Sequence, residues 1–65
     1  MEINLNGKKL TSNSLTLMDL VLEQGFKPES LIAEVNFEVV RQETWKHVSL
    51  SDGDTIELLS FVGGG

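Results

Sequence analysis

Residues 52–62, DGDTIELLSFV, decide how this chain folds. Asp52-Gly53-Asp54 is a turn signal, and the segment that follows it is the most strand-like in the chain. Its apolar character is almost continuous, which is typical of a strand covered by neighbours rather than one at an edge. We therefore predict a strand over residues 55–62 that lies centrally in a sheet, beside the first strand of the chain.

Two pairs of shorter segments predict the other strands. The opening MEINLNGKKL alternates apolar and polar residues and contains Asn6-Gly7, the favoured pair for a type I′ turn, so it predicts a β-hairpin. Residues 31–40, LIAEVNFEVV, predict two short strands joined by a turn at 36–38, with Ala33 and Val35 on one face.

A helix is predicted between these two pairs of strands. Apolar residues recur at helical spacing over Leu17 to Gln24. Thr16 is in position to be the N-cap, and Asp19 stands three residues later, as in a capping box. Leu15 and Leu20 have the spacing of a hydrophobic staple, so we expect these two side chains to pack together.

The order of these elements favours an α+β fold, in which one mixed sheet of about five strands packs on one main helix. Residues 41–54 have no sustained period and are interpreted as an irregular connection with one helical turn at 42–45. Trp45 is the only tryptophan. It is interpreted as a core residue rather than a binding contact.

Composition excludes several classes of function. Ten acidic and five basic residues give a formal charge of −5, which disfavours binding to nucleic acid or to anionic lipid. There is no cysteine, and the single His47 has no partners for a metal centre or a catalytic group, so no metal and no bound cofactor are expected. No segment has the length of a membrane span or the pattern of a signal peptide, so a cytoplasmic location is expected.

The chain ends in SFVGGG, with three glycines directly after the last predicted strand. Together with EVNFEVVRQETW and LSDGDTIELLSFV, this ending resembles the ThiS family, the sulfur carriers of thiamine biosynthesis, over essentially the whole chain. The resemblance implies a ubiquitin-like β-grasp domain over residues 1–62 and a flexible glycine tail at 63–65. Glycines without side chains suit a tail that threads a narrow channel.

The resemblance implies a carrier protein that is a substrate and not an enzyme. An E1-like adenylyltransferase (ThiF-like) would use ATP and Mg²⁺ to adenylate the carboxylate of Gly65. A sulfur donor, such as a cysteine desulfurase persulfide, would convert the adenylate into a thiocarboxylate, and thiazole synthase (ThiG-like) would accept the sulfur. Val62, Gly63 and Gly64 would enter the active site of the partner.

The face opposite the core is predicted to carry a docking patch, formed by Ile32, Leu59 and Phe61. Capping of the core edge by the same residues is the alternative. For function, three alternatives stay open: a sulfur-carrier subunit of molybdopterin synthase (MoaD-like), a ubiquitin-like protein modifier, and a ubiquitin-like interaction module with an inert tail.

Overall fold

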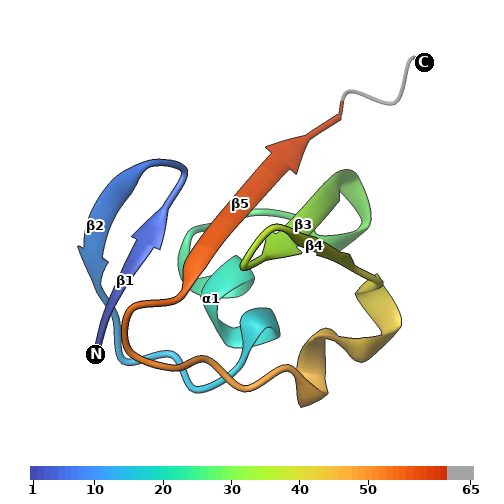
Figure 1. Ribbon diagram of the computed structural model, residues 1–65. Coiled ribbons are helices and arrows are strands. Elements are labelled where there is room, and N and C mark those ends of the chain that lie inside the picture. Colours follow the sequence, from blue (N-terminus) through green and yellow to red (C-terminus); the bar gives the residue numbers. More distant parts are fainter. Residues whose placement is uncertain (62–65) are drawn as a thin grey trace.

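The computed structural model describes residues 1–61, and residues 62–65 lie outside the described part of the chain. The elements are β1 (Glu2–Leu5), β2 (Lys8–Thr11), α1 (Leu17–Glu23), η1 (Pro28–Ser30), β3 (Leu31–Val35), β4 (Glu38–Val40), η2 (Gln42–His47) and β5 (Thr55–Ser60), where η marks a 3₁₀ helix. The five strands form one sheet in the order β2-β1-β5-β3-β4 (Figure 1). Because β5 is parallel to β1 and antiparallel to β3, the predicted mixed sheet with a central last strand is confirmed.

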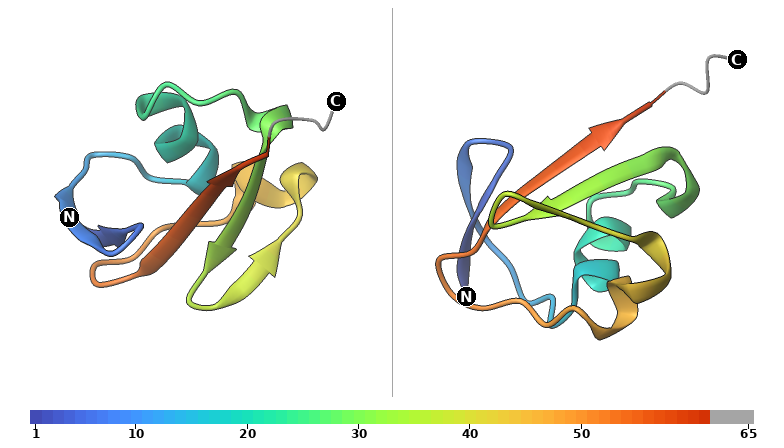
Figure 2. Two further views of the ribbon diagram at one scale, coloured as in Figure 1. Left: turned by 90° about the horizontal axis from the view of Figure 1, so that it is seen from above. Right: turned by 45° about the vertical axis from the view of Figure 1, so that its right-hand side comes forward.

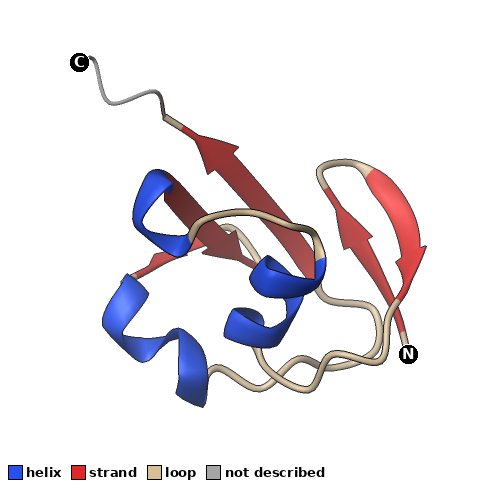
Figure 3. Ribbon diagram, turned by 180° about the vertical axis from the view of Figure 1, so that it is seen from behind, coloured by secondary structure: helices blue, strands red, loops and turns tan. Residues whose placement is uncertain are grey.

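Within residues 1–61, the helices lie on one face of this sheet and none covers the other face (Figure 3). Viewed from above, the sheet and the helical side form two layers (Figure 2). The core lies between them and consists of ten buried apolar residues: Ile3, Leu17, Leu20, Val21, Leu31, Ala33, Trp45, Leu50, Ile56 and Leu58. The α+β class is therefore confirmed, and β5 contributes Ile56 and Leu58 to the core.

The helix α1 begins with the predicted capping box. Asp19 N donates to Thr16 Oγ1 at 3.2 Å, and Thr16 N donates to Asp19 Oδ2 at 3.3 Å. These two bonds satisfy backbone donors that the first turn of a helix leaves free. The helix ends at Glu23, and Gly25 follows with φ +81°, the left-handed conformation that glycine adopts without steric cost.

The predicted contact between Leu15 and Leu20 is wrong. Leu20 is fully buried, whereas the Leu15 side chain is 70% exposed. The reason is a long-range pairing: Leu50 N donates to Leu15 O at 3.0 Å, next to a bridge between Thr16 and Ser49. This pairing turns Leu15 outward and places Leu50 in the core instead.

Trp45 connects the helical layer to the sheet. Its side chain is only 1% exposed, and its Nε1 donates to Val40 O at 3.0 Å. The hydrogen bond satisfies the one polar atom of the indole ring, so the ring is buried without an unpaired donor. The interpretation of Trp45 as a core residue is confirmed, although η2 extends to His47, beyond the single turn predicted at 42–45.

Two hairpins use the same tight turn with different residues. Asn6 and Gly7 have φ +50° and +84°, and Asn36 and Phe37 have φ +52° and +72°. Both residues of a type I′ turn need positive φ, which glycine adopts freely and a bulky side chain does not. Phe37 is also 80% exposed, so no packing compensates for its conformation.

We expect Phe37→Gly to stabilise the protein. The substitution removes the steric cost of a left-handed aromatic residue. The greater chain entropy of glycine in the unfolded state offsets part of this gain, so that the net stabilisation is about 0.5–1 kcal/mol. Urea denaturation of the two proteins measures the difference. Phe37→Ala is the control, because alanine keeps the Cβ atom that causes the strain, and a gain of equal size from it would contradict this explanation.

The described residues 1–61 contain no helix long and apolar enough to cross a lipid bilayer. Within this range the structure describes five strands and ten buried core residues. The predicted boundary between a domain at 1–62 and a tail at 63–65 falls on residues outside it and stays a prediction.

Candidate functional site

The sheet face away from the helices carries an apolar patch, formed by Ile32, Leu59 and Phe61. Ile32 and Leu59 are directly opposite each other in the antiparallel register of β3 and β5. Phe61 continues the same alternation, and its N–H donates to Ser30 O at 3.0 Å. The exposed fractions are 43%, 52% and 46%. The structure thus brings the three predicted residues together at the surface, and their docking role stays a prediction.

β5 extends beyond its neighbour β1 at this end of the sheet. The ladder between β1 and β5 stops at Leu5 and Ile56, whereas β3 continues beside β5 as far as Ser60. Just beyond the last pair, the side chain of Asn6 replaces the missing strand. Its Oδ1 accepts from Leu58 N at 2.8 Å, and its Nδ2 donates to Leu58 O at 3.2 Å. Asn6 therefore holds the part of β5 that leads to the patch.

A second asparagine fixes the start of β5. Asn36 Nδ2 donates to Asp54 Oδ1 at 3.1 Å, and Thr55 N donates to Asn36 Oδ1 at 3.0 Å. The turn before β5 is tied to the first strand as well, because Glu2 N donates to Asp52 Oδ1 at 2.7 Å. Asp52 and Asp54 thus have the structural role predicted for turn residues. β5 is therefore tied to its neighbours at its start and again at Leu58.

Sequence reasoning missed the side-chain role of Asn6. It identified Asn6 only as a turn residue, although an asparagine amide can imitate a peptide group and pair with a strand. The acceptor and donor lie on Leu58, 52 positions away in sequence. A signal of this kind is found only when the neighbours of the turn in the folded sheet are known.

The remaining predicted site residues, Val62, Gly63, Gly64 and Gly65, lie outside the described residues. Phe61 is the last residue that the structure places, and it follows directly on β5. The structure therefore places Phe61, the residue directly before the predicted site. The site itself stays a prediction.

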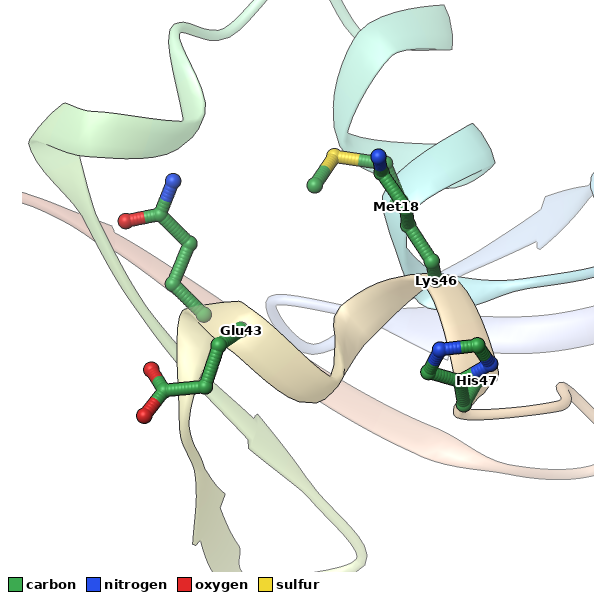
Figure 4. Close-up of a pocket in the computed structure, with 5 residues that line it drawn as sticks. Met18, Glu43, Lys46 and His47 are labelled. Carbon is green, nitrogen blue, oxygen red and sulfur yellow. The ribbon is translucent and has the colours of Figure 1, made fainter.

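A depression of about 480 Å³ lies on the other side of the molecule, between α1 and η2. Its lining includes Met18, Glu43, Lys46 and His47, and Figure 4 shows that the Glu43 and His47 side chains point in different directions. Within residues 1–61, no three histidine, aspartate or glutamate side chains gather as a metal site would require. Nothing in this arrangement resembles an acid and a base directed at one reacting atom.

Comparison with known proteins identifies the family. The ThiS family model matches residues 2–65. A protein of Bacillus subtilis named sulfur carrier protein ThiS is 37% identical over 65 residues, covering 97% of this chain and 98% of that protein. The crystal structure of a thiamine biosynthesis protein (ThiS) from Geobacter metallireducens superposes with a TM-score of 0.83 at 32% identity, covering 100% of both chains.

A third relative is much longer than this chain. A thiazole synthase of Paramagnetospirillum magneticum is 33% identical over 66 residues, a match that covers all of this chain but only 20% of that protein. The chain thus spans about one fifth of the length of this longer relative. The β-grasp architecture and the resemblance predicted from the sequence are confirmed by these matches, and the chain belongs to the ThiS family.

Proposed function

We propose that this protein is a sulfur carrier for thiamine thiazole synthesis, which bears sulfur as a thiocarboxylate on Gly65. The observation that carries the proposal is the extent of the family match, which includes the four C-terminal residues as well as the folded domain. The Bacillus subtilis relative of nearly equal length, named as a sulfur carrier protein, supports the same function.

The chemistry explains why a carrier needs a partner. A free carboxylate is a poor electrophile, so the Gly65 carboxylate first attacks the α-phosphorus of ATP, and pyrophosphate leaves. A persulfide sulfur then attacks the acyl carbon of this adenylate and displaces AMP. A second thiol then attacks the donor's sulfur in the resulting acyl disulfide, so that a disulfide forms between donor and thiol, the original sulfur–sulfur bond breaks and the thiocarboxylate is released. All these steps take place in an E1-like adenylyltransferase that binds ATP and Mg²⁺, with a cysteine desulfurase as the source of the persulfide.

Thiazole synthase is the proposed acceptor of the sulfur. Support comes from the Paramagnetospirillum magneticum thiazole synthase, in which a region similar to this whole chain makes up 20% of the protein. A region joined to an enzyme in one polypeptide has a high effective concentration at its active site, which is useful when the region delivers a substrate atom.

The proposed docking surface is the apolar patch of Ile32, Leu59 and Phe61. Three large apolar side chains that are about half exposed beside the entry to the glycines offer a contact that excludes water from the partner's active site. The patch is at the end of β5 from which residues 62–65 continue. Docking there directs the C-terminal residues toward one place on the partner.

Intact-mass measurement of the protein from its native host tests the proposal. We expect a species about 16 mass units heavier than the encoded chain, because sulfur replaces one oxygen of the terminal carboxylate. Oxidation of Met1 or Met18 adds a similar mass, so the change must be mapped to the C-terminal peptide. Incubation of the purified chain with its adenylyltransferase, ATP and a cysteine desulfurase should raise the fraction of this species.

Three results would contradict the proposal. A chain that stays unmodified after complete incubation is not a sulfur carrier. A chain whose Gly65 is joined to a lysine of another protein is a protein modifier, the alternative that shares the adenylation step. Formation of the thiocarboxylate with transfer to a molybdopterin precursor, and not to thiazole synthase, would identify the MoaD-like alternative.

A further inference from the structure

The turn residue Asn6 makes three hydrogen bonds to β5. Its N–H donates to Ile56 O at 2.9 Å, where the ladder between β1 and β5 ends. Its side chain then reaches the next position on the same side of β5, where Oδ1 accepts from Leu58 N at 2.8 Å and Nδ2 donates to Leu58 O at 3.2 Å. One residue thus pairs with β5 at two successive positions.

The turn itself does not need the amide of Asn6. Asn6 and Gly7 have φ +50° and +84°, and a type I′ turn requires positive φ at both of these positions. A second glycine would meet this requirement, and Gly-Gly is a favoured pair in such turns. The bonds of the amide go instead to Leu58, 52 positions away, so the role of this side chain lies outside its own turn.

Beyond Leu58, β5 is paired on one side only within residues 1–61. On the β3 side the pairing continues, with Ile32 opposite Leu59 and with the N–H of Phe61 donating to Ser30 O at 3.0 Å. On the β1 side the Asn6 amide is the last hydrogen-bond partner in the described part of the chain. The end of β5 is therefore fixed on its second side by one side chain.

This position matters for the C-terminal residues, which continue from Phe61. Leu58 is three residues before Phe61, about 10 Å along the strand. A swing of about 10° at Leu58 displaces Phe61 by about 2 Å over this length. Because a displacement of about 1 Å from the productive position can cost a factor of 100 in rate, the position at which the chain leaves the sheet affects how often Gly65 reaches the reacting atom.

We propose that Asn6 is a positioning residue for the adenylation of Gly65. This inference rests on the proposed function. Asn6 acts through β5 and not by contact with the reacting groups: its amide holds Leu58 on the side that β1 does not reach, while β3 holds the other side. Phe61 then presents the C-terminal residues from one fixed place.

Asn36 offers a matched control at the other end of the same strand. It has φ +52° at the first position of the second tight turn, and its N–H donates to Thr55 O at 2.7 Å. Its side chain bonds Thr55 N at 3.0 Å and Asp54 Oδ1 at 3.1 Å. Asn6→Gly and Asn36→Gly each remove one amide that holds β5, and each leaves a glycine where φ is positive.

The kinetics of adenylation separate positioning from stability. We measure kcat and KM by ATP–pyrophosphate exchange with each carrier variant as substrate, at a temperature where circular dichroism shows all variants folded. For Asn6→Gly we expect kcat to fall about tenfold, because the residues after Phe61 absorb only part of the displacement. KM should stay within about threefold, because the apolar patch remains on the sheet face. For Asn36→Gly both constants should stay within about threefold of the wild type.

Amide hydrogen exchange locates the change in each variant. Asn6→Gly should speed the exchange of the Leu58 amide, which loses its acceptor at 2.8 Å, and Asn36→Gly should speed that of Thr55 instead. Asn6→Asp is a milder second variant, because aspartate suits the turn and accepts from Leu58 N but cannot donate to Leu58 O. Its kcat should lie between those of the wild type and Asn6→Gly.

Each outcome bears on the positioning role. A fall in kcat that is confined to the Asn6 variants, with faster exchange at Leu58, supports it. An equal or larger fall for Asn36→Gly shows a general effect of stability and overturns it, and so does a wild-type kcat for Asn6→Gly; in both cases the carrier function stands. If the wild-type chain supports no exchange at all, the proposed function fails, and the positioning role fails with it.

Discussion

Deletion of Gly65 is expected to abolish formation of the thiocarboxylate and to leave the fold unchanged. The deletion still leaves two terminal glycines, so it tests reach rather than the presence of a di-glycine ending. One residue of extended chain spans about 3.5 Å. Because a displacement of about 1 Å from the productive position can cost a factor of 100, we expect conversion to fall by at least about that factor.

The fold should not change, because the described residues 1–61 already form a five-stranded sheet, the helix α1 and a core of ten buried apolar residues. The melting temperature of the deletion variant, followed by circular dichroism, should match that of the wild type. Gly65→Ala is the control, since it keeps the length of the chain and adds only a methyl group. Loss of cooperative melting after deletion would show that the C-terminal residues support the fold, and normal conversion would show that Gly65 is not the modified residue.

Short-range patterns predicted most of the fold. The pair Asn6-Gly7 marked the first hairpin, and the spacing of Thr16 and Asp19 marked the start of α1, because each feature depends on hydrogen bonds or backbone angles within a few residues. Alternation along β5 separates the patch residues Leu59 and Phe61 from Ile56 and Leu58, which are buried in the core, since side chains of a strand point to its two faces in turn.

Features that depend on distant pairing were not predictable in the same way. The outward position of Leu15 follows from its hydrogen bond with Leu50, and the pairing of Asn6 with Leu58 joins residues far apart in sequence. The short helix η1, of only three residues, has no repeating pattern of its own. These features become visible only when the sheet is assembled.

In the candidate site, too, some features follow from short-range patterns and others depend on distant pairing. Alternation alone was enough to group Ile32, Leu59 and Phe61 on one face. The opposition of Glu34 and Glu57 needs the register between β3 and β5, and a shift of one residue would place one of them toward the core. The pairing of Glu34 with Glu57 was therefore found only in the structure, whereas the patch beside it was predicted from the sequence.

Trp45→Ala is expected to unfold the protein under conditions in which the wild type is folded. Removal of a buried tryptophan costs about 3–5 kcal/mol, from lost apolar burial and the cavity left behind. At about 0.05–0.15 kcal/mol per residue, a domain of 65 residues has a total stability of only about 3–10 kcal/mol. Urea denaturation and circular dichroism should therefore show a midpoint close to zero denaturant, or no cooperative transition.

Trp45→Phe separates the volume of the ring from its hydrogen bond. Phenylalanine keeps much of the apolar contact but leaves Val40 O without its 3.0 Å donor, which should cost about 1–3 kcal/mol and give a folded, weaker domain. If Trp45→Ala melted near the wild type, the core would not depend on the indole ring. The alanine variant keeps Gly63–Gly65 unchanged, so loss of its sulfur acceptance on unfolding would show that the adenylyltransferase recognises the folded sheet and not the glycine sequence alone.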